Sequence, residues 1–104
     1  MNFEEYEDFV EEMRVFPLAH KIIYPALGLA GESGEAVEKV KKWLRGDREL
    51  DREGLLKEMG DVLYYLTALA HDIDYTLKEV METNVIKLSK RKKEDKIKGS
   101  GDNR

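Results

Sequence analysis

Two pairs of acidic side chains carry the chemistry that this sequence can be expected to perform. Glu32 and Glu35 are three positions apart, and so are Glu58 and Asp61, in two stretches whose apolar residues recur at helical spacing. Positions three apart share one face of a helix, so each pair directs two carboxylates toward the same place. Such carboxylates repel each other unless a cation lies between them, and Mg²⁺ prefers carboxylate oxygens together with substrate phosphates. The two pairs therefore predict a magnesium site that takes a phosphate compound.

Chance offers an alternative, because 22 of the 104 residues are acidic and some pairs must arise as solvated surface acids. Glycine favours the functional interpretation. Gly28, Gly31 and Gly34 surround the first pair, and Gly60 lies inside the second. Each glycine inside a helix costs about 0.5–1 kcal/mol relative to alanine, which suggests that something approaches these backbones closely. Close packing of two helices without a ligand would leave the same pattern.

The positions of the acids around their helices add to this interpretation. On a helical wheel, Gly28 and Gly31 share a side with Glu32 and Glu35, and the opposite side carries an apolar stripe that we expect to face the core: Ile23, Leu27, Ala30, Val37, Val40 and Leu44. In the second stretch, Glu58, Asp61 and Tyr65 fall within one narrow sector at the edge of an apolar stripe. Carboxylates at the edge of a core are costly unless they are paired or bind a metal.

Polar side chains also interrupt the apolar face of the last expected helix. Asn84, Lys87 and Arg91 fall inside or beside the stripe formed by Leu77, Val80, Met81 and Leu88. Buried polar groups need partners, and a metal–phosphate complex held by the acids would provide them. The alternative for Lys87 and Arg91 is that their long stems cover apolar surface while their charges reach water.

Four helices are expected to position these side chains, and no alternating strand pattern occurs. Asn2 is expected to cap the first helix, Gly46 to end the second, and Thr76 with Glu79 to form a capping box that starts the fourth. Pro25 either kinks a long second helix or lies in the first turn of a shorter one. The first expected helix spans residues 3–14 and the third spans 51–72. The second begins between residues 18 and 27 and ends at 45, and the fourth begins at 76 and ends within the basic run 90–98. We therefore predict an all-α bundle over residues 1–92, followed by a basic tail with Gly and Ser over 93–104.

Composition excludes several classes of protein. The length fits one domain with a modest core, so self-association is expected. The absence of cysteine excludes disulfides and thiolate metal sites. A net charge of −4 disfavours nucleic-acid binding, and the basic run 87–98 also suits the C-terminus of a helix. The longest apolar stretch, residues 22–30, is too short to span a bilayer, and no leader pattern precedes it, so a cytoplasmic protein is expected.

The acidic motifs resemble those of a known family. Gly28-Leu-Ala-Gly-Glu-Ser-Gly-Glu35, followed after 22 residues by Glu58-Met-Gly-Asp-Val-Leu-Tyr-Tyr65, resembles the E-x-x-E and E-x-x-D signature of MazG-like nucleotide pyrophosphohydrolases. This all-α group is similar to the dimeric dUTPases and dCTP pyrophosphatases. The resemblance covers the second to fourth expected helices and reaches the tail Gly-Ser-Gly-Asp-Asn-Arg. It implies that Mg²⁺, with Mn²⁺ as a substitute, is bound by Glu32, Glu35, Glu58 and Asp61.

The reaction implied by the resemblance is attack of water on the α-phosphorus of a nucleoside triphosphate, which releases pyrophosphate. Lys87 and Arg91 would then hold phosphate oxygens, Asn84 the sugar or phosphate, and Tyr65 would lie near the sugar and base. Candidates for stacking on the base are His20, Tyr24 and Trp43, although a lone aromatic residue on a helix is more often part of the core. A homodimer or homotetramer is implied, in which a tail carrying Asp102 and Arg104 closes over a neighbour's site.

Three other functions compete with this interpretation. A phosphoribosyl-ATP pyrophosphohydrolase would break the same bond in a different nucleotide. A helical interaction module without catalysis would use the glycines as a packing seam and the acids as surface charges. A dinuclear iron or manganese carboxylate bundle requires Glu-x-x-His pairs, and we set it aside because neither His20 nor His71 follows a glutamate by three positions.

Overall fold

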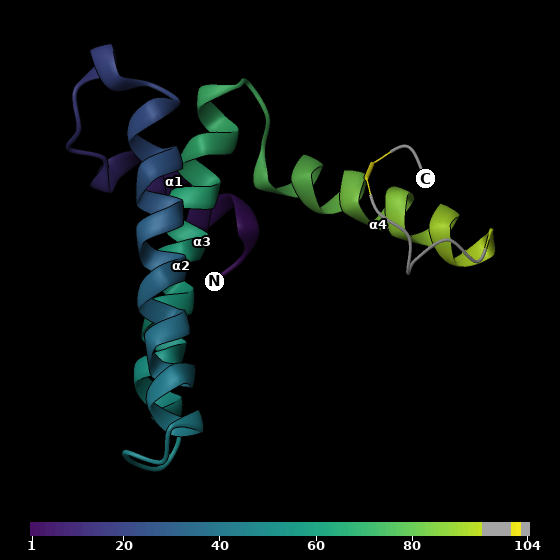
Figure 1. Cartoon of the computed structure of the whole chain (residues 1–104). Helices are drawn as coiled ribbons and strands as arrows, with labels where there is room; N and C mark the ends of the chain where they lie inside the picture. Colours follow the sequence, from purple (N-terminus) through teal and green to yellow (C-terminus); the bar gives the residue numbers. More distant parts are fainter. Residues whose placement is uncertain (95–100, 103–104) are drawn as a thin grey trace.

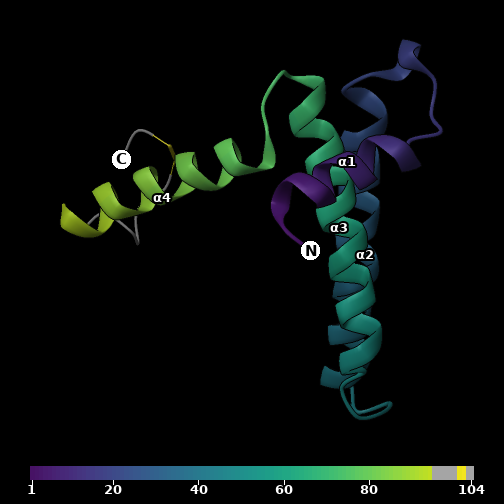
Figure 2. The same cartoon turned by 180° about the vertical axis from the view of Figure 1, so that it is seen from behind.

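The long helices α2 (Ile23–Leu44) and α3 (Arg52–Asp72) lie antiparallel and side by side, and they form the main body of the protein (Figures 1 and 2). The computed structural model describes residues 1–94 and 101–102. Within this part of the chain there are four α-helices, a short 3-10 helix (Leu18–His20) and no strand. The prediction of an all-α protein with four helices is therefore confirmed.

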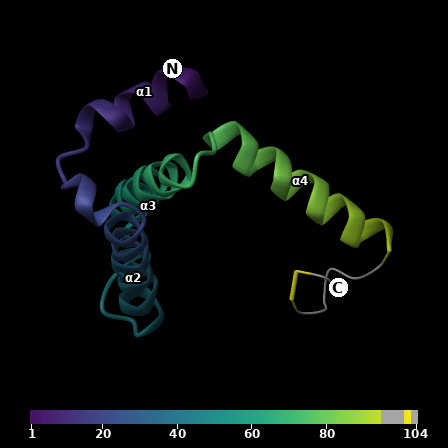
Figure 3. The same cartoon turned by 90° about the horizontal axis from the view of Figure 1, so that it is seen from above.

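The two shorter helices lie differently against the α2–α3 pair. α1 (Phe3–Met13) crosses α3, whereas α4 (Leu77–Lys93) runs outward from the pair (Figures 2 and 3). Both contact α3, and α1 also contacts α4. Beyond its first turns, α4 extends away from α2 and α3 (Figure 1). The last helix is thus joined to the rest of the described chain mainly at its N-terminal end.

Local signals determine where the helices begin and end. Asn2 and Thr76 each accept a hydrogen bond from the backbone N–H three residues on, as expected. Both complete a capping box, which was predicted for Thr76 and not for Asn2. Gly46 follows α2 with a φ of +85°, a left-handed conformation that glycine adopts without strain. Pro25 lies in the first turn of α2, where its missing N–H would have had no partner within the helix. The shorter of the two expected second helices is therefore the one that forms.

The prediction that the apolar stripe of α2 faces the core is wrong for the single chain. Leu27, Val37 and Leu44 are 69%, 64% and 83% exposed. The opposite side of α2, which carries Gly28 and Glu32, packs against α3 instead, because a glycine without a side chain lets the other helix approach closely. The described chain therefore has a small core, and a row of apolar side chains on α2 remains uncovered.

Candidate active site

Three of the four predicted acids converge between the two long helices. Glu32 on α2 and Glu58 and Asp61 on α3 bring carboxylate oxygens within 4.8 Å of one another. Glu32 and Glu58 are partly buried, while Asp61 is exposed. Elsewhere in residues 1–94 and 101–102, no other three acidic or histidine side chains come together in this way. The cluster therefore offers several oxygen ligands to one cation and keeps one side open to solvent.

The electrostatics of this cluster call for a positive partner. Burial raises the pKa of the Glu32 carboxyl, and the nearby Asp61, Glu58 and Glu35 raise it further. Among the described residues, no lysine or arginine forms an ion pair with any of these four acids. A donor set made only of carboxylate oxygens suits hard cations such as Mg²⁺ or Mn²⁺. The residues present thus fit a divalent cation, whose positive charge would lower the pKa of the Glu32 carboxyl that the neighbouring acids raise.

Glu35 lies at the margin of the cluster. It is exposed, one helical turn beyond Glu32, and its charge contributes to the raised pKa of Glu32. It does not belong to the group of three that meets within 4.8 Å. The next acid along α2 is Glu38, which forms an ion pair with Lys41 Nζ at 3.0 Å. Glu38 is therefore a surface residue with its own partner.

Tyr65 lies against α2 beside the acids and accounts for Gly28. A Cβ atom added at Gly28 would lie 2.4 Å from both Cδ1 and Cε1 of the Tyr65 ring. Burial raises the pKa of the Tyr65 hydroxyl, and Tyr24 and Glu32 raise it further. At Gly31, Gly34 and Gly60, by contrast, an added Cβ would have no neighbour within 4 Å among the described residues. Of these four glycines, Gly28 alone is therefore explained by packing within the described residues.

The aromatic candidates for a base pocket occupy different places. The Tyr24 ring lies 6.5 Å from the Tyr65 ring and stacks on Phe16, with centroids 4.5 Å apart. His20 is exposed in the short 3-10 helix, and Trp43 lies at the other end of α2 from Tyr24. Phe16 was not among the residues singled out from the sequence, since its stacking depends on how the chain returns to α2.

Tyr6 is a further residue near the acids that sequence reasoning missed. It belongs to α1, and burial followed by the charge of Asp61 raises the pKa of its hydroxyl. The sequence of α1 contains no motif, and Tyr6 is recognisable there only as one member of an apolar stripe. Its approach to Asp61 depends on the crossing of α1 over α3, which no local pattern indicates.

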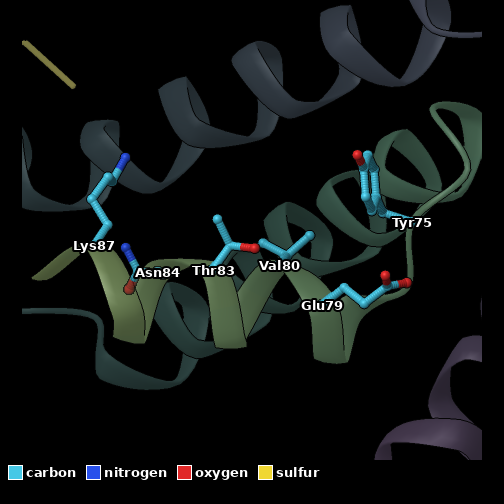
Figure 4. Close-up of a pocket in the computed structure, with 6 residues that line it drawn as sticks. All are labelled: Tyr75, Glu79, Val80, Thr83, Asn84 and Lys87. Atoms are coloured by element: carbon cyan, nitrogen blue, oxygen red, sulfur yellow. The ribbon is translucent and has the colours of Figure 1, made fainter. Parts of the chain in front are cut away.

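The polar residues of α4 lie apart from the acids within the single chain. Asn84 and Lys87 line an open hollow of about 460 Å³, and Figure 4 shows Lys87, Thr83 and Tyr75 projecting to the same side. None of the four acids lines this hollow. Arg91 lies further along α4, in the half that extends away from α2 and α3. One copy of the chain therefore does not bring these side chains to the acidic cluster.

Lys87 and Arg91 are instead held by the chain's own tail. Lys87 Nζ donates to Asp102 Oδ1 at 2.9 Å, and Arg91 Nη2 donates to the same oxygen at 3.2 Å and to the Gly101 carbonyl at 2.9 Å. Arg91 is 5% exposed. A carboxylate thus occupies the place expected for a phosphate oxygen. Arg104, the other tail residue singled out from sequence, lies outside the described residues.

Comparison with known proteins identifies the family of the chain. The profile of the MazG nucleotide pyrophosphohydrolase domain matches residues 24–95, a range that includes both acidic pairs. The chain is also 36% identical over 114 residues to the Gene 37 protein of Mycobacterium phage L5, and the match covers 100% of both sequences. No solved structure matched the chain. The chain therefore belongs to the MazG nucleotide pyrophosphohydrolase family.

None of the described helices combines the length and the apolar character that crossing a membrane requires.

Proposed function

We propose that this protein hydrolyses nucleoside triphosphates to monophosphate and pyrophosphate, by attack of water on the α-phosphorus at a magnesium site between α2 and α3. The observation that carries the proposal is the convergence of Glu32, Glu58 and Asp61 within 4.8 Å. Membership of the MazG family supports the reaction class, since its domain is that of nucleotide pyrophosphohydrolases.

The residues of the site have distinct roles in this reaction. When bound, magnesium supplies charge neutralisation of the triphosphate and lowers the pKa of a coordinated water. Glu32, Glu58 and Asp61 would hold it, and Glu35 would add negative charge at the margin. The exposed position of Asp61 leaves room for water and phosphate oxygens on the open side. Tyr65, packed against Gly28 next to Glu32, would form the wall against which the sugar and base lie.

We infer that a second copy of the chain supplies the phosphate-binding cations. Asn84, Lys87 and Arg91 are on the helix that extends away from their own acids (Figure 1). The uncovered apolar row on α2 and the open space at Gly31 and Gly34 leave a surface that a second copy would cover. A stable interface buries roughly 1,200–2,000 Å² in total, which a helix pair of this length can provide. A homodimer or homotetramer would thus complete the site.

The test is a hydrolysis panel of ribo- and deoxyribonucleoside triphosphates and phosphoribosyl-ATP, with Mg²⁺ or Mn²⁺ and with the products separated. We expect metal-dependent release of pyrophosphate from at least one nucleoside triphosphate. Glu58→Gln should abolish it, because the amide keeps the shape but loses the charge. The matched control is Glu38→Gln, a partly exposed acid of α2 that pairs with Lys41 and should leave the rate unchanged. Turnover of phosphoribosyl-ATP alone, or of no substrate, would support one of the other two functions.

The shared site can be tested by mixing two inactive variants. Glu58→Gln removes a proposed metal ligand, and Lys87→Met removes a proposed phosphate contact. If cations and acids come from different chains, exchange between the two variants creates some sites with both groups intact, and activity reappears. Absence of activity in a mixture shown to contain hetero-oligomers would mean that each chain uses its own Lys87.

A further inference from the structure

A histidine at the end of α3 is held between two glutamates of α1, at the point where three helices meet. His71 Nε2 lies 2.8 Å from Glu7 Oε1, and His71 Nδ1 lies 2.6 Å from Glu11 Oε1. An ionised carboxylate only accepts hydrogen bonds, so both ring nitrogens can be satisfied only if both carry a proton. The geometry therefore describes an imidazolium that bridges two carboxylates.

The same cluster also holds the beginning of α4. Glu7 Oε1 accepts a hydrogen bond at 2.5 Å from the backbone N–H of Leu77, the first residue of α4, which is itself buried. A carboxylate at this position is favoured by the positive end of the helix dipole. Glu7 thus joins α1 to the last turn of α3 and to the first turn of α4. Beyond this joint, α4 extends away from the α2–α3 pair (Figures 1 and 3).

The charges around His71 favour its protonated form. The neighbouring charged groups, besides Glu7 and Glu11, come from α1, from α3 and from the connection to α2: Glu4, Asp8, Arg14, Asp72 and Lys21. Arg14 is engaged by Asp72 at 2.7 Å and by Glu11 at 3.1 Å. Burial alone would lower the pKa of His71, but its hydrogen bonds to Glu7 and Glu11 outweigh burial and raise it. Burial alone would raise the pKa of Glu7, but the Leu77 N–H and His71 lower it.

We propose that the charged ring of His71, clamped between Glu7 and Glu11, locks the direction in which α4 leaves the body of the protein. Loss of its proton leaves one ring nitrogen with a lone pair that faces a carboxylate, so one of the two bridges breaks. The joint between α1, α3 and α4 then loosens, and with it the placement of Lys87 and Arg91 on α4. The lock is a property of the fold and does not depend on the proposed reaction.

The test measures the titration of His71 and the position of α4 in the same protein. Because the chain has no cysteine, nitroxide labels at Lys57→Cys on α3 and Ser89→Cys on α4 report a single distance. The labelled protein is diluted with unlabelled protein so that only distances within one chain are seen. We expect the NMR signals of the His71 ring to titrate above the ordinary pKa of about 6.5. We also expect the distance distribution to be narrow at pH values where Glu7 and Glu11 are ionised and His71 is protonated, and to broaden as the ring loses its proton.

Two variants separate the role of the charge from that of packing. His71→Gln can donate from one nitrogen only, so its distribution should be broad at every pH. Glu11→Gln offers an amide N–H to a neutral ring whose Nε2–H still donates to Glu7, so its distribution should stay narrow when His71 is neutral. A native distribution that does not change while His71 titrates would overturn the proposal. So would a narrow distribution in His71→Gln, or a His71 pKa at or below its ordinary value.

Discussion

Replacing Gly28 with alanine tests the packing of Tyr65 against α2. The new Cβ would lie 2.4 Å from two atoms of the Tyr65 ring and 2.7 Å from its Cγ, which is closer than two non-bonded carbon atoms can approach. The ring cannot move freely, because Tyr64 packs edge-on against it at 5.1 Å. Overpacking costs about 1–3 kcal/mol, from which about 1 kcal/mol is recovered through the higher helix propensity of alanine. Because the overlap involves three ring atoms, the overpacking cost should fall in the upper part of this range, at about 2–3 kcal/mol. The expected net loss in the free energy of unfolding is then about 1–2 kcal/mol.

Chemical denaturation of Gly28→Ala, Tyr65→Ala and the double variant measures this effect. In the Tyr65→Ala background the ring is absent, so Gly28→Ala should become neutral or stabilising, and the double-mutant cycle should show a coupling of about 1–3 kcal/mol. Gly31→Ala is the matched control, because its Cβ meets nothing within 4 Å in the described chain. A Gly28→Ala protein as stable as the native one, in the presence of Tyr65, would refute the reasoning.

Three other predictions concern the metal, the pH and the surface. Magnesium should raise the melting temperature of the native protein by mass action but not that of Glu58→Gln, and equal shifts in differential scanning fluorimetry would contradict the assigned ligand. Because the pKa of His71 is raised in the folded state, its contribution to stability is complete below about pH 6.5 and is lost as the pH rises through its folded-state pKa. The pKa values of Glu7, Glu11 and Asp72 are lowered, so their contributions to stability disappear on acidification. The loss of stability caused by His71→Gln should therefore shrink at alkaline pH, and a loss that is constant across this range in denaturant titrations would argue against the charged ring. Val37→Asp, at a position exposed in the single chain, should reduce the mass found by light scattering, and an unchanged mass would place the interface elsewhere.

Helix ends and the acidic pairs were predictable because their signals are local. Asn2, Thr76 and Gly46 act within a few residues of the ends that they set. The spacing within each acidic pair likewise fixes a shared helical face. That Glu32 would meet Glu58 and Asp61 followed from a short connection between two long helices, which makes them antiparallel neighbours.

Other features could not be predicted, because periodicity reveals that a helix has two faces but not what covers each of them. On α2 the glycine side packs within the chain and the apolar side stays open, the reverse of the expected arrangement. Tyr6 approaches Asp61, and His71 bridges two residues that precede it by 64 and 60 positions. Such contacts depend on how α1 crosses α3, and no local sequence pattern encodes that crossing.

The measurement that tests the central claim most directly is hydrolysis of a preferred nucleoside triphosphate in water enriched in heavy oxygen, with magnesium present. Attack on the α-phosphorus places the heavy oxygen in the nucleoside monophosphate, and mass spectrometry should find none in the pyrophosphate. Heavy oxygen in the pyrophosphate would show attack on the β-phosphorus. Release of orthophosphate would show a different hydrolysis altogether, and either result would contradict the proposed reaction.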